Sequence, residues 1–444
     1  MLSNIKNVWK VHDLRNKILV LLALVALYRL GVAIRVPGID MQQVKQLKAN
    51  VESNGGALGF LNMFSGGAFG SFSIFALGIM PYITASIIMQ VLGVVIPKLE
   101  KLQQEGAVGQ RKITQYTRYL GIAIALLQAT ALTFIFGNGG GNAFFGAAQH
   151  LPQNLRLLPE GMWPRGYLVI LTLVAGAAFV MWLGELISQR GIGNGMSMII
   201  MASVVSSLPF SFYSILQEKK WVPFVLLILV SIGIIIAVVR VELAMRRIPV
   251  QFAKRVVGRR MYGGQNTYIP LKVNQSGVIA IIFASSVLLL PVLASNLLGG
   301  SDGKGWRGSV QRFITENMVN DQGLLYIVLF AVMIVAFAYF YNSIAFDPIR
   351  QADQLRRQGG FIPGIRPGPQ TERYLAKAVN RITLPGALFV AFLAITPYII
   401  LWIFDVRGFQ FGGTTVLIAV GVAMELMRQI DSQLMQRNYE GFLK

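Results

Sequence analysis

Long apolar stretches recur along the whole chain, separated by short polar connections. Ten of these stretches approach the roughly 20 mostly apolar residues that cross the hydrocarbon core of a bilayer. We therefore predict ten membrane-spanning helices, at residues 17–36, 72–96, 118–137, 166–187, 196–216, 222–241, 276–298, 324–346, 383–404 and 413–430. The first stretch follows a basic start, as in a signal peptide, but no small-residue cleavage site follows it. It is predicted to remain as the first membrane helix.

One apolar segment departs from this pattern. Residues 57–71 are largely apolar, with glycines and serines among them, and they lead directly into the second predicted span. Glycine lowers the stability of a helix. A short, weakly held helix and a plain external loop both fit this segment.

Charge orients the predicted spans. The chain has 40 Lys and Arg against 19 Asp and Glu, a net charge of +21, and its basic residues gather in every second connection. The positive-inside rule places these connections and both termini in the cytoplasm. An even number of spans agrees with this orientation.

Ten spans divide into two sets of five, which predicts an N-terminal half (1–216) and a C-terminal half (217–444). If the halves are related, an odd number of spans in each forces inverted topology, a plan typical of transport proteins. No residue-level repeat between the halves supports the relation, so the prediction is architectural.

Two cytoplasmic loops, residues 240–274 and 347–381, are long and strongly basic. Their arginine pairs lie away from the span ends, among β-branched and aromatic residues and turn signals. These charges either mark topology only or form a docking surface. Ribosomal RNA, an acidic protein and anionic lipid headgroups each fit such a surface.

Composition argues against an enzyme. Cysteine is absent, only His12 and His150 are present, and 13% of the residues are charged. No paired carboxylates, metal-ligand motif or Ser/His/Asp arrangement falls at membrane depth, so we predict neither catalysis nor a metal or cofactor. An ion-coupled carrier places ionisable residues at mid-membrane, whereas here Arg29 alone interrupts a span and the other charges lie toward span ends. Isolated polar side chains at mid-span fit helix–helix hydrogen bonds, and an apolar conduit closed by dewetting is the other interpretation.

Six motifs resemble the bacterial SecY family, the channel subunit of the Sec translocon. In chain order they are "NMFSGGAFGSFSIFALGIMPYITASIIMQ", "GQRKITQYTRY", "MWLGELISQRGIGNGMSMII", "PLKVNQSGVIAIIFASS", "GGFIPGIRPG" and "FGGTTVLIAVGVAMELM". The resemblance implies an all-α polytopic membrane protein with ten transmembrane helices. These would form two inverted, pseudo-symmetric five-helix halves around an hourglass pore, with a re-entrant plug helix at about 57–71. The implied function is passage of unfolded secretory polypeptides across the bacterial cytoplasmic membrane and lateral release of membrane segments into it.

The resemblance also assigns residues, motif by motif. The implied pore ring consists of Ile79, Ile83, Ile200, Ile279, Ile282 and Ile418. The implied plug residues are Phe60, Leu61, Met63, Phe64, Ser65, Gly66 and Gly67. The implied lateral-gate contacts are Thr84, Gln128 and Asn274. The implied docking residues are Arg255, Arg259, Arg260, Arg350 and Arg366. One departure is Gln110, where the family usually has arginine, so no role is carried over to it.

The family implies several partners. SecE would hold the two halves together, SecG would lie at the side, and SecA or a ribosome would dock on the cytoplasmic loops. Signal peptides and secretory or membrane-protein substrates would enter the pore, and anionic lipids would surround it. SecA would supply the ATP-driven work. The alternative from another class is an inverted-repeat secondary transporter of a small solute, which solute uptake by the chain alone would reveal.

Overall fold

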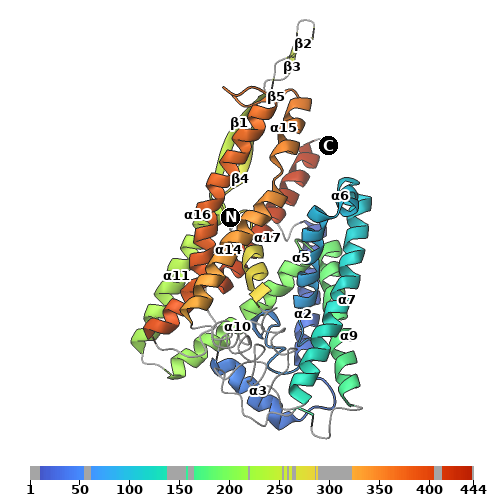
Figure 1. Ribbon diagram of the computed structural model, residues 1–444, viewed down its shortest axis with the longest axis vertical. Coiled ribbons are helices and arrows are strands. Elements are labelled where there is room, and N and C mark those ends of the chain that lie inside the picture. Colours follow the sequence, from blue (N-terminus) through green and yellow to red (C-terminus); the bar gives the residue numbers. More distant parts are fainter. Residues whose placement is uncertain are drawn as a thin grey trace, which may run out of the picture.

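The computed structural model describes residues 11–54, 62–137, 157–158, 165–218, 221–252, 255–257, 260–262, 267–285, 287–288, 323–404 and 413–442. Figure 1 displays long helices that lie side by side, with small strands gathered at one end. The long helices are α2 (His12–Ala33), α5 (Met80–Val95), α7 (Ala107–Gly137), α9 (Arg165–Arg190), α10 (Gly195–Glu218), α11 (Trp221–Leu243), α14 (Leu324–Ala345), α16 (Pro369–Phe404) and α17 (Gly413–Phe442).

Each of these nine helices overlaps one of the ten predicted spans, in the predicted order, although several bounds differ. The seventh predicted span, 276–298, is described only in part, and it is helical over 279–285 and 287–288. Within the described residues, five helices are long and apolar enough to cross a membrane, or six if the bent pair of α5 and α6 (Pro97–Gln104) is one span. The multi-pass helical fold is confirmed, and the count of ten stays a prediction.

The second span was predicted to begin at residue 72, which is wrong. Its helix α5 begins at Met80, because the backbone before it cannot continue a helix. Phe72 and Gly78 have positive φ angles of 45° and 56°, and Pro81 stands in the first turn of α5, where proline is tolerated. Three other helices, α7, α16 and α17, extend beyond their predicted spans as polar extensions.

The two long basic loops form small antiparallel sheets that the sequence analysis did not predict. Strand β1 (Met245–Phe252) lies between β4 (Thr267–Lys272) and β5 (Gly360–Phe361), and β2 (Arg255–Val257) pairs with β3 (Arg260–Tyr262). Ile248 and Val250 of β1 are buried while Pro249 between them is exposed, as the two-residue period of a strand requires. The buried face joins a core with residues of α16, beside α15 (Pro348–Arg357).

Three large apolar clusters fill the body. One contains residues from 36 to 177 only, and a second contains residues from 230 to 420 only. The third combines residues from both ranges. Two of the clusters are therefore confined to one predicted half each and the third is shared, and the division near residue 217 stays a prediction.

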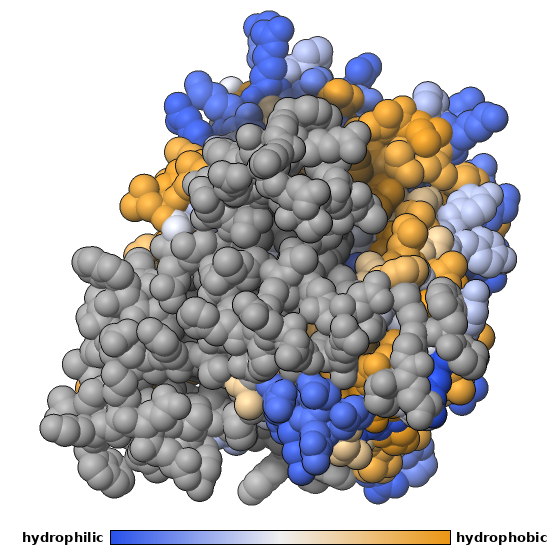
Figure 2. Space-filling model, turned by 60° about the horizontal axis from the view of Figure 1, so that its bottom comes forward, coloured by the Kyte–Doolittle hydropathy of each residue, from blue (hydrophilic) through white to orange (hydrophobic). Residues whose placement is uncertain are grey.

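The outward faces of the helices are apolar. Leu127 and Leu171 are each 72% exposed, and Val332 is 57% exposed. In Figure 2, hydrophobic side chains run down the right-hand side of the molecule, and hydrophilic ones lie mainly at its top, right margin and bottom. Such a surface suits contact with lipid. The remaining described helix, α3 (Met41–Asn54), lies at the end of the molecule opposite the strands (Figure 1).

Candidate functional site: an apolar constriction beneath a buried cap

All six isoleucines of the predicted ring lie in the shared cluster. Ile79 and Ile83 come from the start of α5, Ile200 from α10, Ile279 and Ile282 from the seventh span, and Ile418 from α17. Ile79, Ile200, Ile282 and Ile418 are buried, with Ile418 only 1% exposed. The structure thus brings together four segments from both predicted halves around one set of branched apolar side chains.

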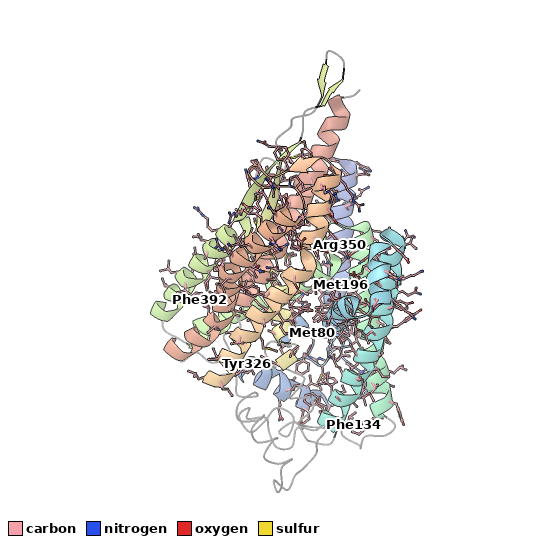
Figure 3. The ribbon with its side chains drawn as sticks, turned by 45° about the horizontal axis from the view of Figure 1, so that its top comes forward. Met80, Phe134, Met196, Tyr326, Arg350 and Phe392 are labelled. Carbon is pink, nitrogen blue, oxygen red and sulfur yellow. The ribbon has the colours of Figure 1, made fainter. Side chains whose placement is uncertain are left out.

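The segment before α5 packs in this same cluster. Residues 62–71, called the cap segment below, consist of one helical turn followed by further turns. Its Met63 and Phe64 belong to the same cluster as the isoleucines, and Thr415 Oγ1 of α17 lies 3.1 Å from Met63 Sδ. The start of α5 at Met80, and Met196 on α10, lie near the centre of the molecule (Figure 3). The predicted plug residues Phe60 and Leu61 lie outside the described residues.

Hydrogen bonds within the cap segment fix its turns. Asn62 Oδ1 accepts the Gly70 amide at 2.8 Å, and Ser65 Oγ accepts the Phe69 amide at 3.0 Å. Gly66 and Gly67 have φ angles of 66° and 88°, a region that glycine enters at little cost. The glycines therefore make turns, the helical part of the cap segment is limited to residues 62–64, and how weakly the segment is held stays a prediction.

Two neighbouring side chains of α2, Tyr28 and Arg29, donate hydrogen bonds to backbone carbonyls of the cap segment. The Tyr28 hydroxyl donates to the Ser65 carbonyl at 3.0 Å and lies 2.8 Å from Ser203 Oγ of α10. Arg29 Nη1 donates to the Gly66 carbonyl at 2.9 Å. The sequence analysis noticed Arg29 as a charge within an apolar span, a usual sign of function. It missed Tyr28 and Ser203, because nothing in their spacing separates them from ordinary helix residues.

The predicted gate residues have local partners. Thr84 Oγ1 donates to the Met80 carbonyl of its own helix at 3.0 Å. Asn274 Nδ2 donates to Glu242 Oε1 of α11 at 2.8 Å, and its Oδ1 accepts the Gly277 amide at 3.0 Å. Gln128 is half-buried on α7. A polar contact across the gate stays a prediction, and Glu242 is the partner of Asn274 that the sequence analysis did not anticipate.

The predicted docking residues belong to the end of the molecule that carries the strands. Arg350 is exposed on α15, and Arg366 is exposed between β5 and α16. Arg255 lies in β2 and Arg260 in β3, whereas Arg259 lies outside the described residues. Figure 1 places β2, β3, β5 and α15 together at this end.

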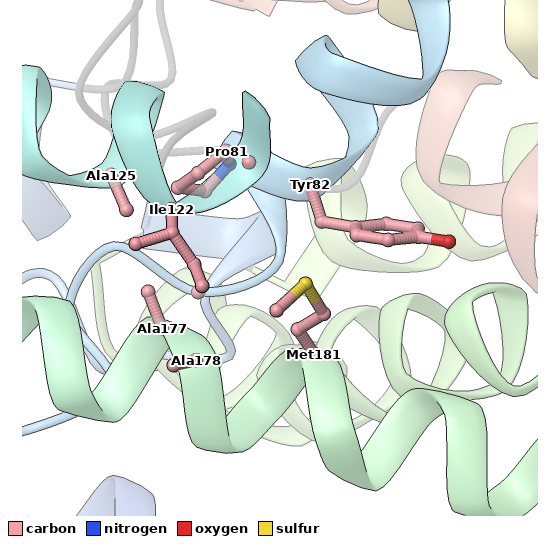
Figure 4. Close-up of a pocket in the computed structure, with 9 residues that line it drawn as sticks. Pro81, Tyr82, Ile122, Ala125, Ala177, Ala178 and Met181 are labelled. Carbon is pink, nitrogen blue, oxygen red and sulfur yellow. The ribbon is translucent and has the colours of Figure 1, made fainter. Parts of the chain in front are cut away.

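A small cavity lies between α5, α7 and α9 (Figure 4). It is lined mainly by small or apolar residues, including Pro81, Gly121, Ala125 and Ala177, and its volume is about 10 Å³. A cavity needs roughly 10–15 Å³ to hold one water molecule, so this one is a packing gap and not a ligand site. Among the described residues, no group of three or more His, Cys, Asp or Glu is placed to hold a metal ion.

Long apolar helices packed around an apolar cluster that includes the cap segment define a multi-pass helical membrane protein. The chain belongs to the SecY family, whose family model matches residues 73–427. Its relatives include the protein translocase subunit SecY of Streptomyces galbus, 46% identical over 449 residues, and that of Mycobacterium bovis, 46% identical over 451 residues. Both alignments cover 100% of this chain and 100% of the relative.

Solved structures share the fold. A protein-conducting channel superposes with a TM-score of 0.57 at 20% identity, covering 94% of this chain and 91% of that one. A SecY structure described by its plug domain superposes with a TM-score of 0.58 at 22% identity, covering 92% and 90%. Sec61 from a canine ribosome–channel complex superposes with a TM-score of 0.56 at 19% identity, covering 94% and 91%. These comparisons give the secondary-transporter alternative no support.

Proposed function

We propose that this chain forms the pore through which a protein translocase passes unfolded polypeptides across a bacterial cytoplasmic membrane. The observation that carries the proposal is the joining of six isoleucines and the cap segment in one apolar cluster between two cores. Full-length relatives at 46% identity are named protein translocase subunits, which supports the same function.

The closed state follows from the chemistry of the constriction. Isoleucine side chains offer water no hydrogen bond, so a narrow ring of them is dewetted and opposes the passage of ions. The cap segment covers this ring and acts as the plug. An incoming polypeptide would displace the cap segment and separate the apolar side chains, which have no specific partner to lose.

Lateral release requires the two halves to part on one side. The resemblance places this opening between α5 and α7 of the first half and the seventh span of the second. Thr84 and Asn274 satisfy their hydrogen bonds within their own halves, which supports easy separation at this seam. Membrane segments would leave the pore through it into lipid.

Partners would dock at the basic end of the molecule. Arg350 and Arg366 are exposed there, and one relative of this fold is a channel in a ribosome complex. Ribosomes, SecA, SecE and SecG remain proposed partners, with both termini and the basic loops in the cytoplasm and anionic lipids around the chain. We expect no catalytic site in this chain, since a docked motor or ribosome would supply the work.

A photo-cross-linking experiment tests the proposal. A photoreactive side chain at Ile83 should attach to a secretory polypeptide arrested during translocation, whereas the same probe at Leu171, which is 72% exposed on α9, should not. Equal labelling at both positions, or labelling at Leu171 only, would place the polypeptide outside the constriction and contradict the proposal.

A further inference from the structure

Two buried hydroxyl groups, those of Tyr28 and Ser203, contact each other and two backbone carbonyl oxygens. Tyr28 Oη lies 3.0 Å from the Ser65 carbonyl of the cap segment and 2.8 Å from Ser203 Oγ. Ser203 Oγ also lies 2.9 Å from the Ile199 carbonyl of its own helix. Tyr28 and Ser203 are each 0% exposed, so water does not reach the hydroxyls while the cap segment is in place.

The number of protons limits these contacts. Each hydroxyl donates one proton and can accept others, so two protons serve three short contacts. With the cap segment in place, the Tyr28 proton is donated to the Ser65 carbonyl. The Ser203 proton can then point to the Ile199 carbonyl or to Tyr28 Oη, and the second choice makes the 2.8 Å contact between the two hydroxyls a hydrogen bond. Ile199 loses nothing essential in that state, because its carbonyl is also an acceptor within the α-helix.

Removal of the cap segment allows a second arrangement. The Tyr28 proton can turn to Ser203 Oγ, and the Ser203 proton can turn to the Ile199 carbonyl. Both hydroxyls keep an acceptor, and neither side chain has to change its rotamer. A buried donor left without an acceptor is costly, and this rearrangement avoids that cost.

We propose that Tyr28 and Ser203 form a two-position hydrogen-bond relay that holds the cap segment and remains satisfied after its release. The inference rests on the proposed function, in which the cap segment moves aside. The relay gives the closed state a specific hydrogen bond, and it lowers the free-energy cost of opening because the Tyr28 hydroxyl keeps an acceptor. Tyr28 and Ser203 are thus positioning residues for channel opening.

The neighbouring contact fits the same role. Arg29 donates to the Gly66 carbonyl but is only half-buried, so its guanidinium can exchange that bond for water when the cap segment leaves. A Cβ atom on Gly66 would lie 3.2 Å from the Cα and Cβ atoms of Ser203. The cap backbone therefore lies close against the relay.

The relay predicts opposite effects of two hydroxyl deletions. Tyr28→Phe removes the bond to the cap segment and should raise the ratio of open to closed channels about fivefold. Ser203→Ala leaves the closed-state bond of Tyr28 intact but removes its acceptor in the open state. That variant should lower the same ratio by about fivefold or more. In the double variant the effect of Ser203→Ala should vanish, because no tyrosine proton remains to be accepted.

Single-channel recording of the intact translocase complex in planar bilayers measures this ratio. Ser206→Ala is the matched control, since Ser206 Oγ donates to the Ser203 carbonyl of its own helix at 2.7 Å, and it should change the ratio little. A neutral Ser203→Ala would mean that water satisfies Tyr28 after release and would overturn the relay. Additive effects in the double variant would overturn it as well.

A separate measurement keeps the relay and the proposed function distinguishable. Cross-linking of the arrested polypeptide at Ile83 should persist in both single variants. If that cross-link is absent even with the native residues at positions 28 and 203, the proposed pore is wrong. If the cross-link is present but the two variants change opening in the same direction, only the relay is wrong.

Discussion

Arg350 Nη2 of α15 lies 3.3 Å from Glu100 Oε1 of α6. The same guanidinium is held at its Nε by Asp347 Oδ2 at 3.0 Å, and Asp347 also caps α15 through the Ile349 and Arg350 amides. Because α6 follows α5 and α15 follows α14, the pair joins the two predicted halves, and both helices lie toward the end that carries the strands (Figure 1).

This ion pair should bias the channel weakly toward the closed state. Both side chains are exposed, at 57% and 48%, and exposed pairs contribute about 0.2–1 kcal/mol and weaken with salt. Glu100→Gln should therefore raise the open fraction by up to about fivefold at low salt and have little effect at high salt. Single-channel recording at two ionic strengths measures this, with the exposed neighbour Glu105→Gln as the control. An effect of Glu100→Gln that does not depend on salt would contradict the interpretation.

A polar side chain in the isoleucine ring should open a path for ions. Ile418→Asn places an amide at a position that is 1% exposed, and burial of an unpaired amide costs about 1–3 kcal/mol unless water enters with it. We expect water entry and leakage of small ions from reconstituted vesicles. Ile418→Val keeps the ring apolar and should remain tight. Equal tightness of both variants would argue that the seal lies elsewhere.

A methyl group on Gly66 should dislodge the cap segment. Its Cβ would lie 2.8 Å from Arg29 Nη1 and 3.2 Å from Ser203 Cα, at a φ angle of 66°. Gly67 is the matched control, because it has a similar φ of 88° but nothing within 4 Å of its Cβ. Gly66→Ala should therefore make a cysteine at Ser65 much more accessible to thiol reagents than Gly67→Ala does. Similar accessibility in the two variants would mean that backbone strain, and not the clash, decides the outcome.

Charge reversal at Arg366 should block docking without disturbing the fold. The Arg366 side chain is exposed, and its backbone carbonyl accepts a hydrogen bond from Thr371 Oγ1 at 3.0 Å, which the substitution leaves in place. Arg366→Glu should reduce polypeptide translocation at least about tenfold if its guanidinium binds a charged partner, since charge-assisted bonds contribute about 1.5–3 kcal/mol. Lys45→Glu on α3, at the opposite end, should leave translocation intact. Normal translocation by Arg366→Glu would remove this residue from the docking surface.

The ion pair of Arg118 and Glu185 should matter more for stability than that of Arg350 and Glu100. It joins α7 and α9 at 2.5 Å, and the Glu185 side chain is only 14% exposed. Arg118→Met would leave this carboxylate without its partner, at a cost of about 1–3 kcal/mol. Arg350→Met should cost less than about 1 kcal/mol. Thermal unfolding of the detergent-solubilised variants compares the two, and equal shifts in Tm would contradict this ranking.

The helices, and the side chains that share the central apolar cluster, were largely predictable from the sequence. Apolar length sets a span, and the i, i+4 spacing of Ile79 and Ile83 places both on one helix face. The family motifs supplied Ile200 and Ile418 from distant helices, and the structure brings them into the same cluster. What periodicity alone did not reveal is that these faces meet, since a lipid-facing isoleucine has the same local pattern.

The cap and the loop strands were harder to predict, for a physical reason. The shape of the cap segment depends on bonds from Tyr28 and Arg29, which are 37 residues away in the chain. Strand β1 exists because its partners β4 and β5 and the surface of α16 cover it. Local propensity carries little information about such long-range partners.

The three-stranded sheet has a mechanical consequence. Its β5 strand belongs to the loop of residues 347–381, while β1 and β4 belong to the loop of residues 240–274. Strand β1 begins two residues after the end of α11, and its buried Ile248 packs in one core with Leu375 of α16. A force applied to either loop is therefore borne by both, and it pulls on α11 and α16 together.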